Sequence, residues 1–171
     1  MRARLPTLRR LTDIVVLLLG VCLLVVLVGR YVPFTFRTWQ VPDTYLSEVF
    51  VDASLSGIDF SVAQKTLILV LQSDCVFCQE SMPFYRRLLS DRGVTDVQVV
   101  AAAPPYDTRI GEYLVSEGVT VDSVVFVESG VLPVSGAPTL LMVDSKGLVT
   151  HAWLGLLNAE HESEVMSVAF G

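Results

Sequence analysis

Two cysteines stand close together in the sequence, and their spacing points to thiol chemistry. Cys75 and Cys78 lie in the stretch SDCVFCQESMP, over 73–83, with a Val-Phe pair between them. Thiols at this spacing suit thiol–disulfide exchange, a static disulfide or half of a metal site. A zinc site needs about four ligands, and the two histidines, His151 and His161, fall on a predicted strand and a predicted helix. We therefore predict no metal site and favour exchange over a static disulfide.

The segments around the cysteine pair explain how it would react. The apolar run TLILVLQ, over 66–72, ends directly before the pair and predicts a buried strand, and 75–92 has apolar residues at helical spacing. A sulfur at a helix start faces unpaired backbone N–H groups and the positive end of the helix dipole, which stabilises its thiolate. We predict that Cys75 attacks and that Cys78, one turn later, resolves the mixed disulfide. The Cys75–Cys78 disulfide would then be the redox group, and no further cofactor is expected.

Strand and helix patterns alternate along the rest of the chain and predict an α/β fold. We expect a short strand at 58–62, a buried strand at 97–103, a helix at 108–118 and a strand at 123–128. Two further strands flank the DSKG turn within 139–155, and Asn158 precedes a last helix at 159–170. This order describes a mainly parallel sheet with an antiparallel hairpin at its edge, in one domain over 53–171.

The beginning of the chain has the pattern of a membrane anchor. Residues 1–13 carry four arginines, and 14–29 carry no charge. Sixteen helical residues cover roughly 24 Å, and apolar neighbours extend this to a predicted transmembrane helix over 14–32, followed by a linker segment over 33–52. A cleaved signal peptide has a similar pattern, but only Gly29 offers a small residue after the apolar core. The arginines place 1–13 in the cytoplasm and the domain outside it.

Charge separates the same two parts of the chain. Residues 1–37 carry six arginines against Asp13, a net charge of +5, whereas residues 38–171 carry a net charge of −11. A nucleic-acid-binding domain needs a basic face, so we predict that nucleic acid is not a partner.

A second stretch carries a family resemblance. VSGAPTLLMVDSKGLVTHAWLG, over 134–155, resembles the part of thioredoxin-fold proteins that places a cis-proline beside the cysteine pair. The resemblance implies a central mixed sheet flanked by helices, a cis peptide bond before Pro138, and a substrate groove that Ala137, Pro138 and Thr139 shape. Pro83, five residues after Cys78, matches the helix-kinking proline of that family.

The long interval between Cys75 and Pro138, together with the predicted anchor, resembles the TlpA/ResA-like group. These are bacterial, membrane-tethered thiol–disulfide oxidoreductases that act outside the cytoplasm, in the periplasm. The resemblance implies that the partners are exported proteins with cysteines, and that a membrane thiol carrier supplies electrons. It favours a reductant over an oxidant.

Several residues depart from the family pattern. Asp74 stands where the family usually has tryptophan, and its carboxylate either opposes thiolate formation at Cys75 or caps the helix. The buried acid of relatives would fall at Leu69 or Ser81, and neither residue is acidic. Glu80 is next to the second of these positions, but one helical step turns it about 100° away. Asp74 and Glu80 are therefore the candidate modulators of the pair.

Three other functions fit parts of the sequence. A thiol peroxidase needs a threonine and a proline just before its cysteine, where this chain has Ser73 and Asp74. A copper carrier of related fold uses CxxxC and a distant histidine, and the spacing here is one residue short. A binding module with an idle disulfide differs from an exchange protein only in failing to form mixed disulfides.

Overall fold

The structure is a computed structural model that describes residues 13–24, 49–93 and 95–171. The chain divides into two units, Met1–Thr38 and Trp39–Gly171. A helix covers 13–24 in the first unit. None of the helices described for this chain combines the length and hydropathy needed to cross a bilayer. Residues 25–32 of the predicted anchor, and the linker segment up to residue 48, lie outside the described residues.

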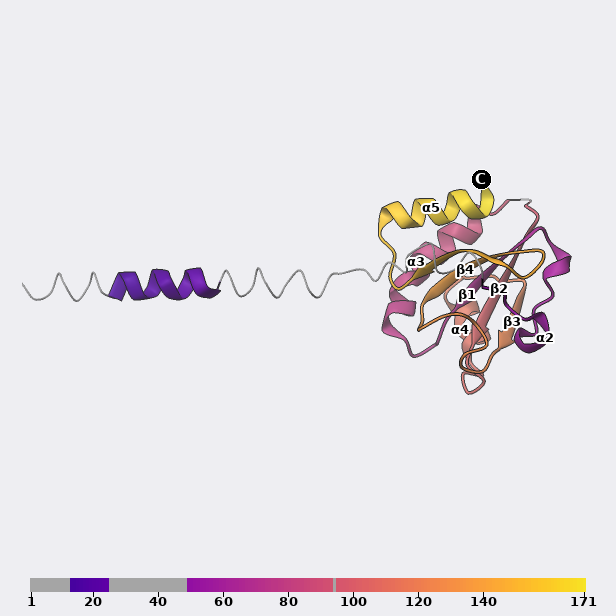
Figure 1. The fold of residues 1–171 in the computed structure, drawn as a ribbon, viewed down its shortest axis with the longest axis horizontal. Coiled ribbons are helices and arrows are strands. Elements are labelled where there is room, and N and C mark those ends of the chain that lie inside the picture. Colours follow the sequence, from indigo (N-terminus) through magenta and orange to yellow (C-terminus); the bar gives the residue numbers. More distant parts are fainter. Residues whose placement is uncertain (1–12, 25–48, 94) are drawn as a thin grey trace, which may run out of the picture. The chain divides into compact units, whose positions relative to one another are not determined.

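The second unit is built on one five-stranded sheet (Figure 1). The strands lie in the order β3-β2-β1-β4-β5, and β1 pairs in parallel with β2 and antiparallel with β4. The elements follow the chain as α2 (Ala53–Ser56), the 3₁₀ helix η2 (Phe60–Val62), β1 (Lys65–Val70), α3 (Val76–Ser90), β2 (Val97–Ala103), α4 (Ile110–Ser116), β3 (Ser123–Phe126), β4 (Thr139–Asp144), β5 (Val149–Leu154) and α5 (Ala159–Phe170). This mixed sheet matches the predicted order of strands after the cysteine pair.

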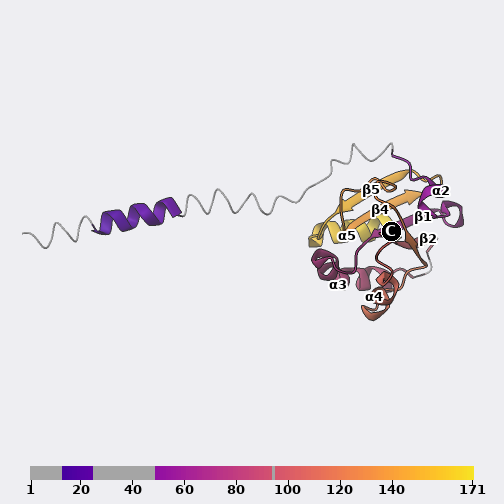
Figure 2. The ribbon, with the colours of Figure 1, turned by 90° about the horizontal axis from the view of Figure 1, so that it is seen from below.

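The two faces of the sheet are covered differently. Side chains alternate along each strand, so Leu67 and Leu69 of β1 face one core cluster, while Ile68 and Val70 face the other. The first cluster contains residues of α3, α4 and α5, and Figure 2 shows α3 and α4 on the opposite side of the sheet from α2. The second cluster is closed by the short helix η2 and by loops, which contribute the residues Val51, Ile58, Phe60, Val127 and Leu132.

The strand predicted over 58–62 is wrong, because that segment contains the 3₁₀ helix η2. The apolar residues Ile58 and Phe60 are both buried, which produced the strand-like alternation. Between them, the Asp59 carboxylate accepts hydrogen bonds from the backbone N–H and the hydroxyl of Ser61. A short aspartate side chain bonded two residues ahead turns the chain instead of extending it.

Several predicted elements agree with the structure in place and type. Strand β2 and helix α5 have the predicted bounds, and Asn158 caps α5 by accepting a hydrogen bond from the His161 N–H at 2.9 Å. Helix α4 and strand β3 are shorter than predicted. In the DSKG turn, the Asp144 carboxylate accepts hydrogen bonds from the backbone N–H groups of Lys146 and Leu148, each at 2.9 Å.

Candidate redox site

Cys75 lies where the chain passes from β1 into α3. It is the N-cap residue of α3, and its Sγ accepts a hydrogen bond from the Cys78 N–H at 3.2 Å. The sulfur therefore takes the place of a capping oxygen at the positive end of the helix. Asp74 is exposed and is not the cap, so the capping role predicted for it belongs to Cys75. The side chain of Cys75 is partly exposed and can meet a reactant.

Cys78 lies one turn further along α3 and is completely buried. Both cysteines are free thiols in the structure. Burial raises the pKa of the Cys78 thiol to about 12, and the hydrogen bond with Cys75 and the negative charge of Asp74 add to the rise. Cys78 therefore stays protonated near neutral pH, and only Cys75 is placed to react first.

The loop before β4 approaches the cysteine pair from the other side. The Ala137–Pro138 peptide bond is cis, as the family resemblance implies. The Cys75 Sγ lies 3.5 Å from the Ala137 carbonyl oxygen, within reach of a weak S–H hydrogen bond. Pro138 is buried, and the Thr139 hydroxyl donates to the Gly136 carbonyl at 2.6 Å, which fixes the bend of the loop. Residues far apart in sequence thus meet around one sulfur.

The remaining predicted residues lie at the edge of this arrangement. Glu80 is exposed on α3. Ser81 is buried, and its hydroxyl donates to the Phe77 carbonyl oxygen at 2.8 Å. One turn on, burial raises the pKa of the Tyr85 phenol. In the described part of the chain, no group of three or more histidine, cysteine or acidic side chains is arranged to hold a metal ion.

Asp107 is a residue of this site that the sequence did not single out. It lies in the loop between β2 and α4 and is 7% exposed. Its carboxylate accepts hydrogen bonds from the Ser73 backbone N–H and from the Ser73 hydroxyl, each at 2.7 Å. Both bonds hold the segment that leads into Cys75. Because β1 and β2 are parallel neighbours, their carboxyl ends lie at one edge of the sheet. The position of Asp107 shortly after β2 was therefore a signal that its carboxylate lies near the segment that follows β1.

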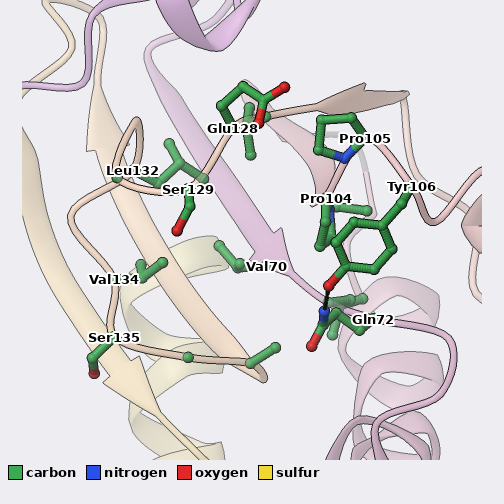
Figure 3. Close-up of a pocket in the computed structure, with 16 residues that line it drawn as sticks. Val70, Gln72, Pro104, Pro105, Tyr106, Glu128, Ser129, Leu132, Val134 and Ser135 are labelled. Atoms are coloured by element: carbon green, nitrogen blue, oxygen red, sulfur yellow. Dashed lines mark hydrogen bonds between the residues drawn. The ribbon is translucent and has the colours of Figure 1, made fainter.

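A cavity of about 360 Å³ opens beside the loop that carries Ala137 (Figure 3). Gln72 and Tyr106 form one wall, where the Gln72 amide donates a hydrogen bond to the Tyr106 hydroxyl. Val70 and Leu132 contribute apolar surface from the second core cluster. Of the three residues expected to shape a substrate groove, Ala137 lines this cavity and Pro138 and Thr139 do not. The rest of the lining was not predicted, because it depends on how three loops meet at the carboxyl ends of the parallel strands.

The fold and the position of the cysteines define the class of structure to which the chain belongs. No protein-family model and no curated protein sequence matches the chain. Solved structures do match: a thiol-disulfide isomerase from Corynebacterium glutamicum is 14% identical, with a TM-score of 0.51 over 73% of this chain and 92% of that one. A thioredoxin-family thiol:disulfide interchange protein from Chlorobium tepidum TLS is 17% identical, with a TM-score of 0.50 over the same two shares.

A third similar structure is the thioredoxin domain of a thiol-disulfide oxidoreductase from Bacteroides vulgatus. It is 11% identical, with a TM-score of 0.51 over 66% of this chain and 83% of that domain. At these identities the likeness establishes the fold. The chain has a thioredoxin-like α/β fold, with a central mixed sheet flanked by helices, as predicted from the sequence.

Proposed function

We propose that this protein is a thiol–disulfide oxidoreductase that acts on exported proteins through Cys75 and Cys78. One observation carries the proposal: the partly exposed Cys75 Sγ lies at the start of α3, where it accepts the Cys78 N–H at 3.2 Å and faces the Ala137 carbonyl at 3.5 Å. A helix N-terminus favours a thiolate, which is the nucleophile in exchange. The similar structures named above are thiol–disulfide isomerases or oxidoreductases, which agrees with this chemistry.

The reaction takes place in two balanced steps. The Cys75 thiolate attacks one sulfur of a target disulfide, forms a mixed disulfide and releases the other target sulfur as a thiolate, which takes up a proton. Cys78 then loses its proton and attacks the Cys75 sulfur. The Cys75–Cys78 disulfide forms, and the target leaves with its second thiol. The target gains two electrons, and the cysteine pair loses them.

The direction and location are part of the same proposal. We assign the protein as a reductant of exported proteins, regenerated by a membrane thiol carrier. The reverse direction, oxidation of target thiols, uses the same two steps backwards. The uncharged segment 14–29 behind an arginine-rich start supports an anchor that holds the domain outside the cytoplasm. The acidic domain agrees with protein partners and not with nucleic acid.

Trapping of mixed disulfides tests the proposal. In a Cys78→Ala variant the first step proceeds and the second cannot, so covalent complexes with cysteine-containing proteins should accumulate and dissolve when dithiothreitol is added. Cys75→Ala is the matched control and should trap nothing. If neither variant traps a target, and the wild-type chain does not react with a small disulfide, the protein is a binding module and not an exchange enzyme.

The reduction potential of the cysteine pair decides the direction. A value close to that of thioredoxin, about −270 mV, would support a reductant, and a value near −120 mV would support an oxidant.

A further inference from the structure

Two of the residues that line the cavity beside Ala137 contact Cys75. Ala137 lines the cavity, and its carbonyl oxygen lies 3.5 Å from the Cys75 Sγ. Gln72 also lines the cavity, and the Gln72 carbonyl accepts a hydrogen bond from the Cys75 N–H at 3.3 Å. The cavity therefore lies beside the residue that a target cysteine would approach.

The lining of the cavity is mostly apolar. Val70, Val127 and Leu132 belong to the second core cluster, and Val134 packs against it. Tyr106 closes one wall and is hydrogen-bonded to Gln72, while Ser129 lies on the opposite side in Figure 3. A volume of about 360 Å³ lies in the range of pockets that hold a ligand group, and the lining suits a large apolar side chain.

The charged side chains named at and near the cavity are acidic. Among the described residues that line it, Glu128 alone is charged, and it is exposed. Asp74, next to Cys75, is also exposed, and residues 38–171 carry a net charge of −11. An approaching segment with positive charge is attracted to this surface, and one with negative charge is repelled.

We propose that this cavity is a specificity pocket, which takes a large apolar side chain within two residues of the target's reacting cysteine, on a segment that carries positive charge. The proposal rests on the exchange function proposed above and adds which targets are chosen. An extended chain advances about 3.3 Å per residue. A side chain one or two residues from the target cysteine can therefore reach the cavity, because the carbonyl oxygen of its lining residue Ala137 lies 3.5 Å from the Cys75 sulfur.

Peptide substrates test this with the full-length chain. Each peptide has one cysteine coupled to thionitrobenzoate, whose release is followed by its absorbance. Phenylalanine replaces glycine at each of the two positions before and after the cysteine in turn. We expect phenylalanine in at least one position to raise kcat/KM about tenfold or more. Replacing a distal glutamate of the best peptide by lysine should raise kcat/KM about three- to tenfold at low salt, with little effect left at 1 M salt.

Two variants of the protein separate the effect of the cavity from the effect of the charge of Glu128. Ser129→Trp places an indole in the cavity and should abolish the preference for phenylalanine, and its control is Ser163→Trp on the exposed side of α5. Glu128→Lys should reverse the preference for lysine over glutamate, and its control is Glu164→Lys, also exposed on α5. If Ser129→Trp does not fold, the peptide series on the wild-type chain still decides.

The outcomes distinguish the two proposals. A chain that does not react even with free dithiobis-nitrobenzoate has no exchange activity, and the proposed function fails. A chain that reacts with this small disulfide but treats all the peptides alike retains the proposed function, and the specificity pocket is overturned. Equal effects of Ser129→Trp and Ser163→Trp would also overturn the pocket.

Discussion

The two cysteines, three residues apart, have opposite environments. Cys75 caps α3 and is partly exposed, while Cys78 points into the core and is fully buried. Their difference would set the order of the proposed exchange reaction, because a thiol must lose its proton to attack. Among the described residues Asp107 is the one buried acidic side chain, and its carboxylate binds Ser73, two residues before Cys75.

Alkylation should reveal this difference directly. In a Cys22→Ser background, the Cys78 thiol of a Cys75→Ala variant should react with iodoacetamide at pH 8 at least about a hundredfold more slowly than an unfolded cysteine. Burial is the main cause of the raised pKa of about 12 and remains when Cys75 is removed. A thiol with a raised pKa is deprotonated only as the pH approaches that value. Burial keeps the pKa of the Cys78 thiol above its ordinary value of 9.0 in this variant, so the rate should keep rising above pH 9, and a plateau below pH 9 would contradict this.

Asp107 should act as a positioning residue for Cys75. Asp107→Ala leaves the Ser73 N–H without its partner inside the protein, which costs about 1–3 kcal/mol of unfolding free energy. We also expect kcat/KM for a peptide disulfide to fall about tenfold. Ser73→Ala removes only the hydroxyl bond and should have a smaller effect on both measurements. The control is Asp96→Ala, because Asp96 is exposed.

The fall in kcat/KM has to be separated from a general loss of stability. Both variants are assayed at a temperature at which circular dichroism shows that they are folded. The rate of Cys75 alkylation at pH 8 should change in Asp107→Ala, because the segment that leads into Cys75 loses two hydrogen bonds, and it should stay unchanged in Asp96→Ala. An unchanged alkylation rate together with an unchanged kcat/KM would show that Asp107 contributes only to folding.

At the scale of the elements, the β4–β5 hairpin ties the segment before α2 to the sheet. Gly147 lies in the turn with φ +85°, and its carbonyl accepts a hydrogen bond from the Val51 N–H at 2.8 Å. A Cβ at this position would lie 2.9 Å from the Val51 carbonyl oxygen. Glycine is needed here both for the left-handed conformation and for the close approach of the two backbones.

Gly147→Ala should therefore lower the free energy of unfolding by about 1–3 kcal/mol. Urea denaturation followed by tryptophan fluorescence measures the change, and Lys146→Ala in the same turn is the control. The reaction of Cys75 with a small disulfide should be unaffected in the folded variant, since the turn and α3 lie at different parts of the sheet. A free energy equal to that of the wild type would contradict the strain argument.

The sequence predicted the elements that carry the cysteines more accurately than the loops around them. Uninterrupted apolar runs indicated β1 and β2, and helical spacing indicated α3, because these signals are local. The Asp107–Ser73 bonds join residues 34 apart in sequence, and local sequence patterns do not predict a contact over that separation. The segment 58–62 was misjudged for a different reason: alternating burial occurs in a tight turn as well as in a strand.

At the scale of the whole chain, the contrast between an uncharged segment and an acidic domain predicts where the protein is found. The full-length chain should sediment with membranes and resist extraction at alkaline pH, while a chain that begins at residue 38 should be soluble. Leu19→Asp with Leu23→Asp should release the full-length chain, because each aspartate costs about 3 kcal/mol in the middle of a bilayer helix. Leu55→Asp with Leu156→Asp, both exposed in the domain, is the control. Release of the unmodified chain by alkaline extraction would contradict the anchor.

The covering of the sheet by helices on one face and by irregular chain on the other has a practical consequence. Helix α3 fixes both sulfurs on the first face, whereas the chain over 127–136 covers the second face beside them. Connections of this kind tolerate insertions and sequence changes far better than helices and strands. If the proposed exchange function holds, new segments could therefore be grafted between β3 and β4 to direct the protein to chosen targets, while the cysteine pair on α3 stays unchanged.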